Sequence, residues 1–239
     1  FGHVFTQPDH RRKGVCKTIM ALQMEDFRRR GGGLLLLGTG YESPPYWIYH
    51  HFGFRPLDET GFMRYSSEDD FEAHYFAPCG AKAIGVGWGD WPRLCALASL
   101  DMGGLRSISF DLFGRGNLEG PFIKFKRGLE EKADQVKAAL LESEKGAVVG
   151  CAPVVPDLRW RNGPYLLDFF WHPHFSAYTH ALFDEIEFPA GKVQCYVDLE
   201  SPEKIDLLER MGFEKEALLK SQISWGGQDL DVMIYSKGA

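Results

Sequence analysis

The run Arg11-Arg12-Lys13-Gly14-Val15-Cys16 is the segment of this sequence best suited to bind an anion. It follows an apolar stretch that ends at Pro8 and opens a predicted helix. The first backbone N–H groups of a helix have no internal acceptor, and the helix dipole adds partial positive charge there. Gly14 lets a ligand approach the backbone closely, and Lys17 adds a fourth cation to the three in the run. The pattern predicts a site for a diphosphate group.

The elements that would position this run alternate between strand and helix. Expected in order are a strand at 2–6, a helix at 14–30, a strand at 34–37, a helix at 43–51 and further strand within 55–65. The unbroken run of four leucines at 34–37 is typical of a strand buried on both faces. Ser43 followed by Pro44 favours a helix start. This order predicts an α/β (α+β layered) unit.

A boundary is expected near residue 80, where a polar stretch at 66–70 is followed by Pro78-Cys79-Gly80. The predicted domains are therefore residues 1–79 and 80–239. The second should contain helices near 91–100, 121–134, 177–186 and 202–212, with strands near 135–141, 147–155, 165–171, 193–197, 218–225 and 230–236.

Two short patterns in the first domain return in the second. Ser43-Pro44 with Gly53-Phe54 is echoed by Ser201-Pro202 with Gly212-Phe213, 158 or 159 residues later. Thr6-Gln7-Pro8 is echoed by Trp171-His172-Pro173, 165 residues later. A repeat of this length indicates a duplicated domain rather than a solenoid.

The anion-binding run resembles the signature [Q/R]-x-x-G-x-[G/A] of the GNAT (GCN5-related) N-acetyltransferase family. Residues 4–16 match it except at Cys16, where the family usually has Gly or Ala. Residues 49–54, Tyr-His-His-Phe-Gly-Phe, resemble the family's Y-x-x-x-G-F, whereas Glu42 and Pro45 replace the Asn and Ala often found before it. The resemblance implies two GNAT-like acyl-CoA acyltransferase domains with mixed central sheets flanked by helices.

The same resemblance implies a cofactor, acetyl-CoA or another acyl-CoA, in a V-shaped opening between parallel strands at 2–6 and 34–38. An acceptor amine would attack the thioester directly, and Tyr49 would protonate the leaving thiolate as general acid. The implied cofactor-binding residues are Val4, Phe5 and Thr6 through main chain, and Arg11, Arg12, Lys13, Gly14, Val15, Cys16 and Lys17 around the diphosphate. His3 and His10 flank this site, and surface positions are expected for both.

The second domain resembles the family only in outline. Leu208 stands where Tyr49 stands, and no Arg-x-x-Gly loop follows Pro173. We expect a degenerate copy without cofactor binding, serving structure, acceptor recognition or dimerisation. A complete family member has three strands and two helices before the strand that leads to the loop, but about three residues precede that strand here. The first domain is therefore expected to be truncated, and the one matching set of elements, at 80–160, is assigned to the second.

Composition excludes several function classes. A net charge of −6 over 239 residues argues against a nucleic-acid binder. Five scattered cysteines without C-x-x-C spacing predict neither disulfides nor a zinc site, and adjacent His50 and His51 cannot face one pocket, so no metal is expected. Neither a membrane span nor a signal peptide is visible, and the expected location is the cytoplasm.

Three interpretations remain open from the sequence. The leading one is an N-acyltransferase that moves an acyl group from acyl-CoA to an unidentified amine. The second is a non-catalytic acyl-CoA-binding or structural protein of the same fold. The third is that the truncated chain binds nothing. The open edge of a strand at 2–6 could pair with another chain, so a homodimer is possible in each case.

Overall fold

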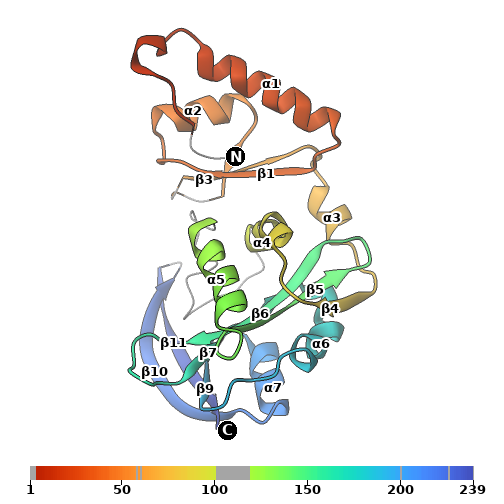
Figure 1. The fold of residues 1–239 in the computed structure, drawn as a ribbon, viewed down its shortest axis with the longest axis vertical. Coiled ribbons are helices and arrows are strands. Elements are labelled where there is room, and N and C mark those ends of the chain that lie inside the picture. The colour runs from red at the N-terminus through yellow and green to blue at the C-terminus, as the bar shows by residue number, and fades with distance from the viewer. Residues whose placement is uncertain are drawn as a thin grey trace. The chain divides into compact units, whose positions relative to one another are not determined.

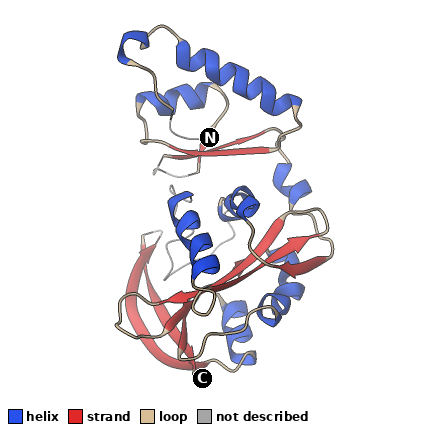
Figure 2. Cartoon of the chain, in the orientation of Figure 1, coloured by secondary structure: helices blue, strands red, loops and turns tan. Residues whose placement is uncertain are grey.

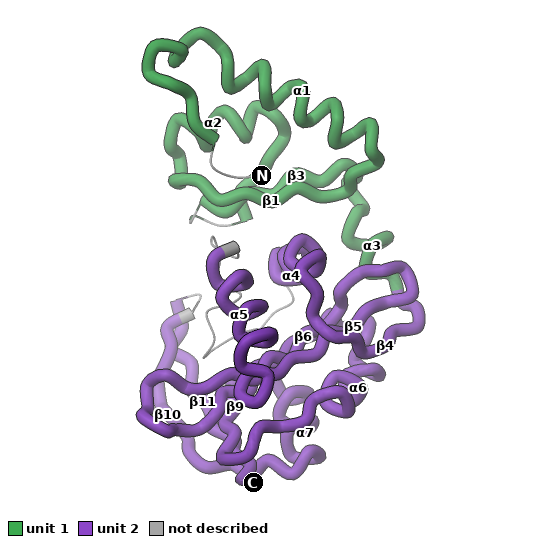
Figure 3. The backbone as a smooth tube through the Cα atoms, viewed as in Figure 1, with its two compact units in different colours: residues 1–77, 115–117 green, residues 78–114, 118–239 purple. Residues whose placement is uncertain are grey.

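A computed structural model of the chain describes residues 4–57, 59, 61–100, 119–199, 201–225 and 227–238. The chain divides into two compact units (Figure 3). Unit 1 comprises residues 1–77 and 115–117, and unit 2 comprises residues 78–114 and 118–239. No helix in the described ranges is both long and apolar enough to cross a bilayer.

Unit 1 is a small antiparallel sheet with two helices on one face (Figure 1). Its strands are ordered β1-β3-β2, and β1 pairs with β3 in the register Leu34↔Ser66 to Gly38↔Phe62. The elements are η1 (Pro8–His10), α1 (Val15–Arg29), β1 (Leu34–Gly38), α2 (Pro44–His51), β2 (Arg55–Pro56), β3 (Phe62–Ser66) and α3 (Phe71–Tyr75).

Helix α1 begins at Val15, directly after Gly14, and its last turn carries arginines that complement the helix dipole. Met20 and Met24, one turn apart, are each 1% exposed and face the sheet. Two further apolar residues of this helix lie outside the core, because Ile19 is 50% and Leu22 61% exposed.

The core of unit 1 lies between the two helices and the sheet. It contains Met20, Met24, Leu37, Tyr46, Tyr49, Phe54 and Met63. Of the four leucines at 34–37, only Leu37 is buried. The expectation of a strand buried on both faces is therefore wrong, because helices of unit 1 cover only one face of β1.

The strand expected at 2–6 is also not found. Residues 1–3, including His3, lie outside the described residues, and residues 4–6 are irregular, with Phe5 71% exposed. A strand needs a hydrogen-bonded neighbour, and within the described residues β1 pairs only with β3. The implied pair of parallel strands, 2–6 with 34–38, is accordingly not formed.

Unit 2 is built on a mixed eight-stranded sheet (Figure 2). Its strand order is β10-β11-β9-β7-β6-β5-β4, with β8 pairing β6 beside this path. The elements are β4 (Ala81–Ile84), η2 (Trp88–Asp90), α4 (Trp91–Ala98), α5 (Glu119–Glu131), β5 (Lys137–Ser143), β6 (Val148–Pro156), β7 (Tyr165–Leu167), β8 (Phe170–Trp171), η4 (Pro173–Tyr178), α6 (Thr179–Asp184), β9 (Val193–Asp198), α7 (Pro202–Arg210), β10 (Glu214–Trp225) and β11 (Gln228–Lys237).

Parallel pairing occurs once among the described strands, between β7 and β9, in the register Tyr165↔Val193 to Leu167↔Cys195. Beyond Leu167 the chain leaves β9, and β8 pairs with β6 instead. Phe169, between β7 and β8, is fully buried and packs edge-on against Phe183 at 5.1 Å. The place where the two parallel strands diverge is thus bordered by an aromatic of the core.

The echoed Gly-Phe signature has the same local structure in both units. Gly53 and Gly212 have φ values of 96° and 79° and end α2 and α7. The N–H of Phe54 donates to the carbonyl of Tyr49 at 3.2 Å, and that of Phe213 donates to the carbonyl of Leu208 at 2.9 Å. This is the 6→1 bond of a Schellman cap, which requires a left-handed residue and favours glycine.

The echoed Ser-Pro start is less uniform. Ser43 caps α2, because its Oγ accepts from the N–H of Tyr46 at 3.4 Å. Ser201 does not cap α7 with its side chain; its Oγ lies 3.2 Å from both carboxylate oxygens of Asp198. The expected repetition of the cap is therefore wrong for α7.

Candidate functional site

The turn between η1 and α1 presents its backbone N–H groups outward. Arg12 and Gly14 both adopt left-handed conformations, with φ values of 59° and 81°. Such a conformation next to helical residues makes successive amides converge on one concavity. Within the described residues, none of the amides of residues 12–17 donates a backbone hydrogen bond. We call these six residues the amide turn.

The backbone conformation at Gly14 favours glycine. A left-handed φ strains an ordinary L-residue by about 1–2 kcal/mol, whereas glycine adopts it freely. Because Gly14 is the N-cap of α1 and has no side chain, it leaves the first-turn amides uncapped. The local sequence therefore produces an anion-binding helix start of the kind expected.

Four cations surround the amide turn. Arg11, Arg12, Lys13 and Lys17 form no salt bridge within the described part of the chain. Arg11 serves a second purpose, because its Nε donates to the carbonyl of Thr6 at 3.0 Å and its guanidinium lies 5.8 Å from the ring centroid of Phe5. These contacts hold residues 4–6 beside the turn although they form no strand.

The amide turn opens into a cavity of about 650 Å³, within the range typical of small-molecule sites. The cavity lies wholly within unit 1 and is formed by residues 4–6, the amide turn and α2. Its lining residues are Val4, Phe5, Thr6, His10, Arg11, Arg12, Gly14, Val15, Cys16, Lys17, Pro44, Pro45, Ile48 and Tyr49. Of the sequence-predicted site residues, the structure brings all but Lys13 to this cavity.

Tyr49 forms part of the cavity wall. It projects from α2, is 7% exposed and packs edge-on against Phe54 at 6.0 Å between ring centroids. Burial raises the pKa of the Tyr49 phenol above its usual value of about 10, and the nearby Cys16 thiol adds to the rise. The phenol is therefore protonated at neutral pH and can donate a proton.

Sequence reasoning missed Pro44, Pro45 and Ile48, which line the cavity from α2. Their signal was present: Pro45 lies four residues before Tyr49 and three before Ile48, spacings that place helical residues side by side. His10 was expected at the surface; it is exposed and also borders the cavity.

In the echoed segment of unit 2, backbone N–H groups of the turn are hydrogen-bonded within the turn. After Pro173 the chain forms η4, in which the N–H of His174 donates to Nδ1 of His172 at 3.2 Å and that of Phe175 donates to its carbonyl at 2.9 Å. Leu208, at the position that echoes Tyr49, is fully buried. No lysine or arginine lies in η4. The groups that make the unit 1 site are thus replaced or engaged.

Comparison with solved structures identifies the fold. The chain is similar to ribosomal-protein-alanine N-acetyltransferase from Brucella melitensis, with a TM-score of 0.51 and 16% identity over 66% of this chain and 99% of that chain. It is similar to a putative acetyltransferase from Salmonella typhimurium solved with acetyl-CoA, with a TM-score of 0.51 and 14% identity over 66% of this chain and 94% of that one. No protein-family model matches the sequence, and no curated protein matches it.

These likenesses establish a mixed α/β fold of the GNAT acetyltransferase type. At 14–16% identity they show the fold and not the chemistry of the cavity in unit 1.

Proposed function

We propose that this protein is an acyl-CoA-dependent N-acyltransferase, using acetyl-CoA, whose cofactor site is the cavity of unit 1. The observation that carries the proposal is the amide turn, six successive N–H groups without a backbone acceptor, surrounded by cations that form no salt bridge, both within the described residues. A diphosphate bound there would accept several charge-assisted hydrogen bonds at a helix N-terminus.

The proposed reaction runs from the amide turn toward Tyr49. With the diphosphate on the turn, residues 4–6 would hold the acyl arm of the cofactor, because they line the same cavity. The acceptor amine attacks the thioester carbonyl, and the tetrahedral intermediate collapses with cleavage of the C–S bond. Tyr49 gives its proton to the departing thiolate, and the amine nitrogen loses a proton to solvent. The protonated phenol of Tyr49 suits this role.

The division of labour between the units belongs to the same proposal. Unit 1 corresponds to the C-terminal portion of a GNAT-like domain, and unit 2 to a second, degenerate domain without cofactor. The engaged N–H groups of η4 and the buried Leu208 support this reading of unit 2. All five cysteines carry free thiols, which supports the cytoplasm as location.

A second candidate function, acyl-CoA binding without catalysis, is favoured by one observation. Residues 4–6, whose backbone would align the acyl arm, form no strand, and the carbonyl of Thr6 is engaged by Arg11. A cavity of this kind can hold the cofactor without orienting its thioester for attack.

Calorimetric titration with acetyl-CoA, followed by turnover assays on a panel of primary amines, separates the two. Loss of a general acid in Tyr49→Phe should lower kcat by about 100-fold or more with little change in the affinity for acetyl-CoA. Tyr46→Phe is the matched control, because Tyr46 lies on the same helix, is 4% exposed and does not line the cavity.

Absence of acetyl-CoA binding would refute the proposal as a whole. Binding without turnover of any amine would support the non-catalytic candidate. Turnover that Tyr49→Phe and Tyr46→Phe reduce equally would remove Tyr49 from the mechanism.

A further inference from the structure

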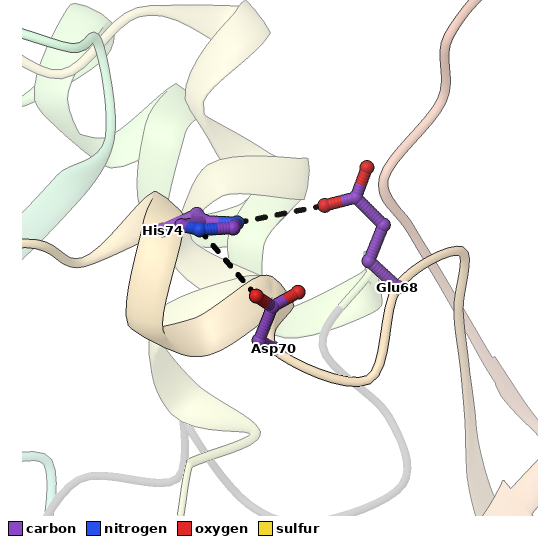
Figure 4. Close-up of side chains that lie close together, drawn as sticks. All are labelled: Glu68, Asp70 and His74. Carbon is purple, nitrogen blue, oxygen red and sulfur yellow. Dashed lines mark ion pairs between the residues drawn. The ribbon is translucent and has the colours of Figure 1, made fainter.

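Three potential metal ligands converge on the surface of unit 1, away from the cavity. Glu68 precedes α3, Asp70 is its N-cap, and His74 lies in its last turn. Nδ1 of His74 lies 3.6 Å from a carboxylate oxygen of Glu68, and Nε2 lies 3.4 Å from one of Asp70. Figure 4 shows the imidazole between the two carboxylates. Among the described residues, no other three His, Cys, Asp or Glu side chains converge in this way.

We propose that Glu68, Asp70 and His74 bind a divalent transition-metal ion of the Zn²⁺ class. Imidazole nitrogen combined with carboxylate oxygen suits Zn²⁺, whereas Ca²⁺ and Mg²⁺ prefer all-oxygen sites. Zinc ligands lie at about 2.0–2.2 Å, so tetrahedral donors are about 3.3–3.6 Å apart. One donor atom from each of the three residues lies within 4.8 Å of the other two, so small side-chain movements bring them to that spacing.

Backbone hydrogen bonds fix the segment that carries the three side chains. The N–H of Phe71 donates to the carbonyl of Glu68 at 3.3 Å, and that of His74 donates to the carbonyl of Asp70 at 3.1 Å. The N–H of Ser67 donates to the carbonyl of Gly33 at 2.9 Å, which ties the loop to the start of β1. The ligand-bearing segment is therefore anchored before any ion binds.

The side chains themselves remain free to adjust. They are 60–69% exposed, and both imidazole–carboxylate distances exceed those of ordinary hydrogen bonds. The two carboxylates contact different nitrogens of the imidazole. One ion would be bound after the exposed imidazole rotates so that a single nitrogen faces both carboxylates, with water completing the coordination shell. The neighbouring Glu72 is engaged by Arg64 and does not compete.

The test is zinc titration of the full, tag-free chain after chelator treatment, by calorimetry and by competition with a chromophoric chelator. One Zn²⁺ per chain should bind. His74→Ala should weaken this binding by more than the roughly tenfold that loss of even an outer-shell partner costs. Asp70→Asn and Glu68→Gln should each weaken it as well. Co²⁺ should give the visible absorption of a site with nitrogen and oxygen ligands, and His74→Ala should abolish it.

Two matched controls exclude general charge effects. Asp69→Asn removes an exposed carboxylate from the same loop, and His180→Ala removes an exposed histidine from α6. Both should leave zinc affinity unchanged. The proposal is overturned if no stoichiometric ion binds, if His74→Ala binds zinc as the parent does, or if Asp69→Asn weakens binding as much as Asp70→Asn. Circular dichroism of each variant in chelator confirms that the fold is retained.

Discussion

A short sequence pattern occurs twice, at residues 4–8 of unit 1 and 169–173 of unit 2. The two segments have different structures. Phe170 is 2% exposed and lies in β8, paired with β6, whereas Phe5, at the echoed position, is 71% exposed in irregular chain. The difference follows from the neighbours. In unit 2 a long strand, β6, accepts the segment, and the described residues of unit 1 offer no such partner. A strand sequence without a partner strand does not pair.

The turns after these segments differ for a local reason. In unit 1, Gly14 and the left-handed Arg12 leave the first amides of α1 without backbone acceptors within the described residues. In unit 2, His172 accepts the N–H groups of His174 and Phe175 through its ring and its carbonyl. In unit 2 the segment pairs as a strand, and amides of the turn after it are hydrogen-bonded within the turn. In unit 1 the segment forms no strand among the described residues, and the amides of the turn after it have no backbone acceptor there. The paired strand and the turn able to bind an anionic ligand thus lie in different units.

The largest expected effect tests whether the repeated segment is better packed in unit 2 than in unit 1. Phe170→Ala should lower the free energy of unfolding by about 3–5 kcal/mol, because it removes a buried aromatic from a packed sheet. Phe5→Ala should change it by no more than about 0.5 kcal/mol, because the ring is mostly exposed. Urea denaturation followed by circular dichroism measures both. Equal costs would mean that residues 4–8 are as well packed as β8.

The next effect tests whether the amide turn of unit 1 binds the diphosphate of acetyl-CoA. Gly14→Asp places a carboxylate at the amide turn, where like-charge repulsion of several kcal/mol should weaken acetyl-CoA binding on the order of 100-fold or more. The change should be tolerated structurally. Within the described residues no atom lies within 4 Å of a Cβ at this position, and Asp adopts left-handed backbone more readily than most residues.

Gly14→Asn is the matched control, since it has the same shape without the charge. It should weaken binding much less than Gly14→Asp, and both variants should unfold within about 1 kcal/mol of the parent. Calorimetry gives the affinities. If the two variants bind acetyl-CoA equally, charge at the amide turn does not govern binding. If Gly14→Asp binds as the parent does, the diphosphate lies elsewhere.

The sequence predicted the features that depend on short-range chemistry. The open helix start at Gly14, the cap at Ser43 and the left-handed glycine before Phe54 each follow from residues within one or two turns. Tyr49 reaches the cavity because α2 begins and ends where those signals place it.

The sequence did not predict what depends on distant partners. Whether residues 4–6 pair and whether residues 34–36 are buried depends on the elements packed beside them, which their own sequence does not specify. The cluster of Glu68, Asp70 and His74 was not predicted, because neither cysteine spacing nor adjacent histidines indicate it. The i,i+4 spacing of Asp70 and His74 was its sequence signal.

The smallest expected effect uses thiol reactivity to compare the two units. Cys95 is 7% exposed and burial raises its pKa to about 12, so on the order of one molecule in ten thousand carries the thiolate at pH 8. Burial also raises the pKa of Cys151 and Cys195, with contributions from Asp168. Raising the pH would increase labelling of these thiols only far above pH 8. The native cysteines that react should therefore be Cys16 and Cys79, which are half-buried.

Acetyl-CoA should distinguish these two reactive thiols, because Cys16 lines the cavity and Cys79 does not. At a free concentration of ten times Kd, mass action leaves about one site in eleven empty, so labelling of Cys16 should slow about tenfold while the rate at Cys79 stays constant. Mass spectrometry of peptides from a timed alkylation measures both rates. Unchanged labelling of Cys16 at saturating acetyl-CoA would show that the cofactor does not occupy the cavity beside the amide turn. Equal protection of Cys79 would instead indicate that acetyl-CoA lowers thiol accessibility throughout the chain. The difference between the amide turn of unit 1 and the hydrogen-bonded turn of unit 2 would then not explain binding.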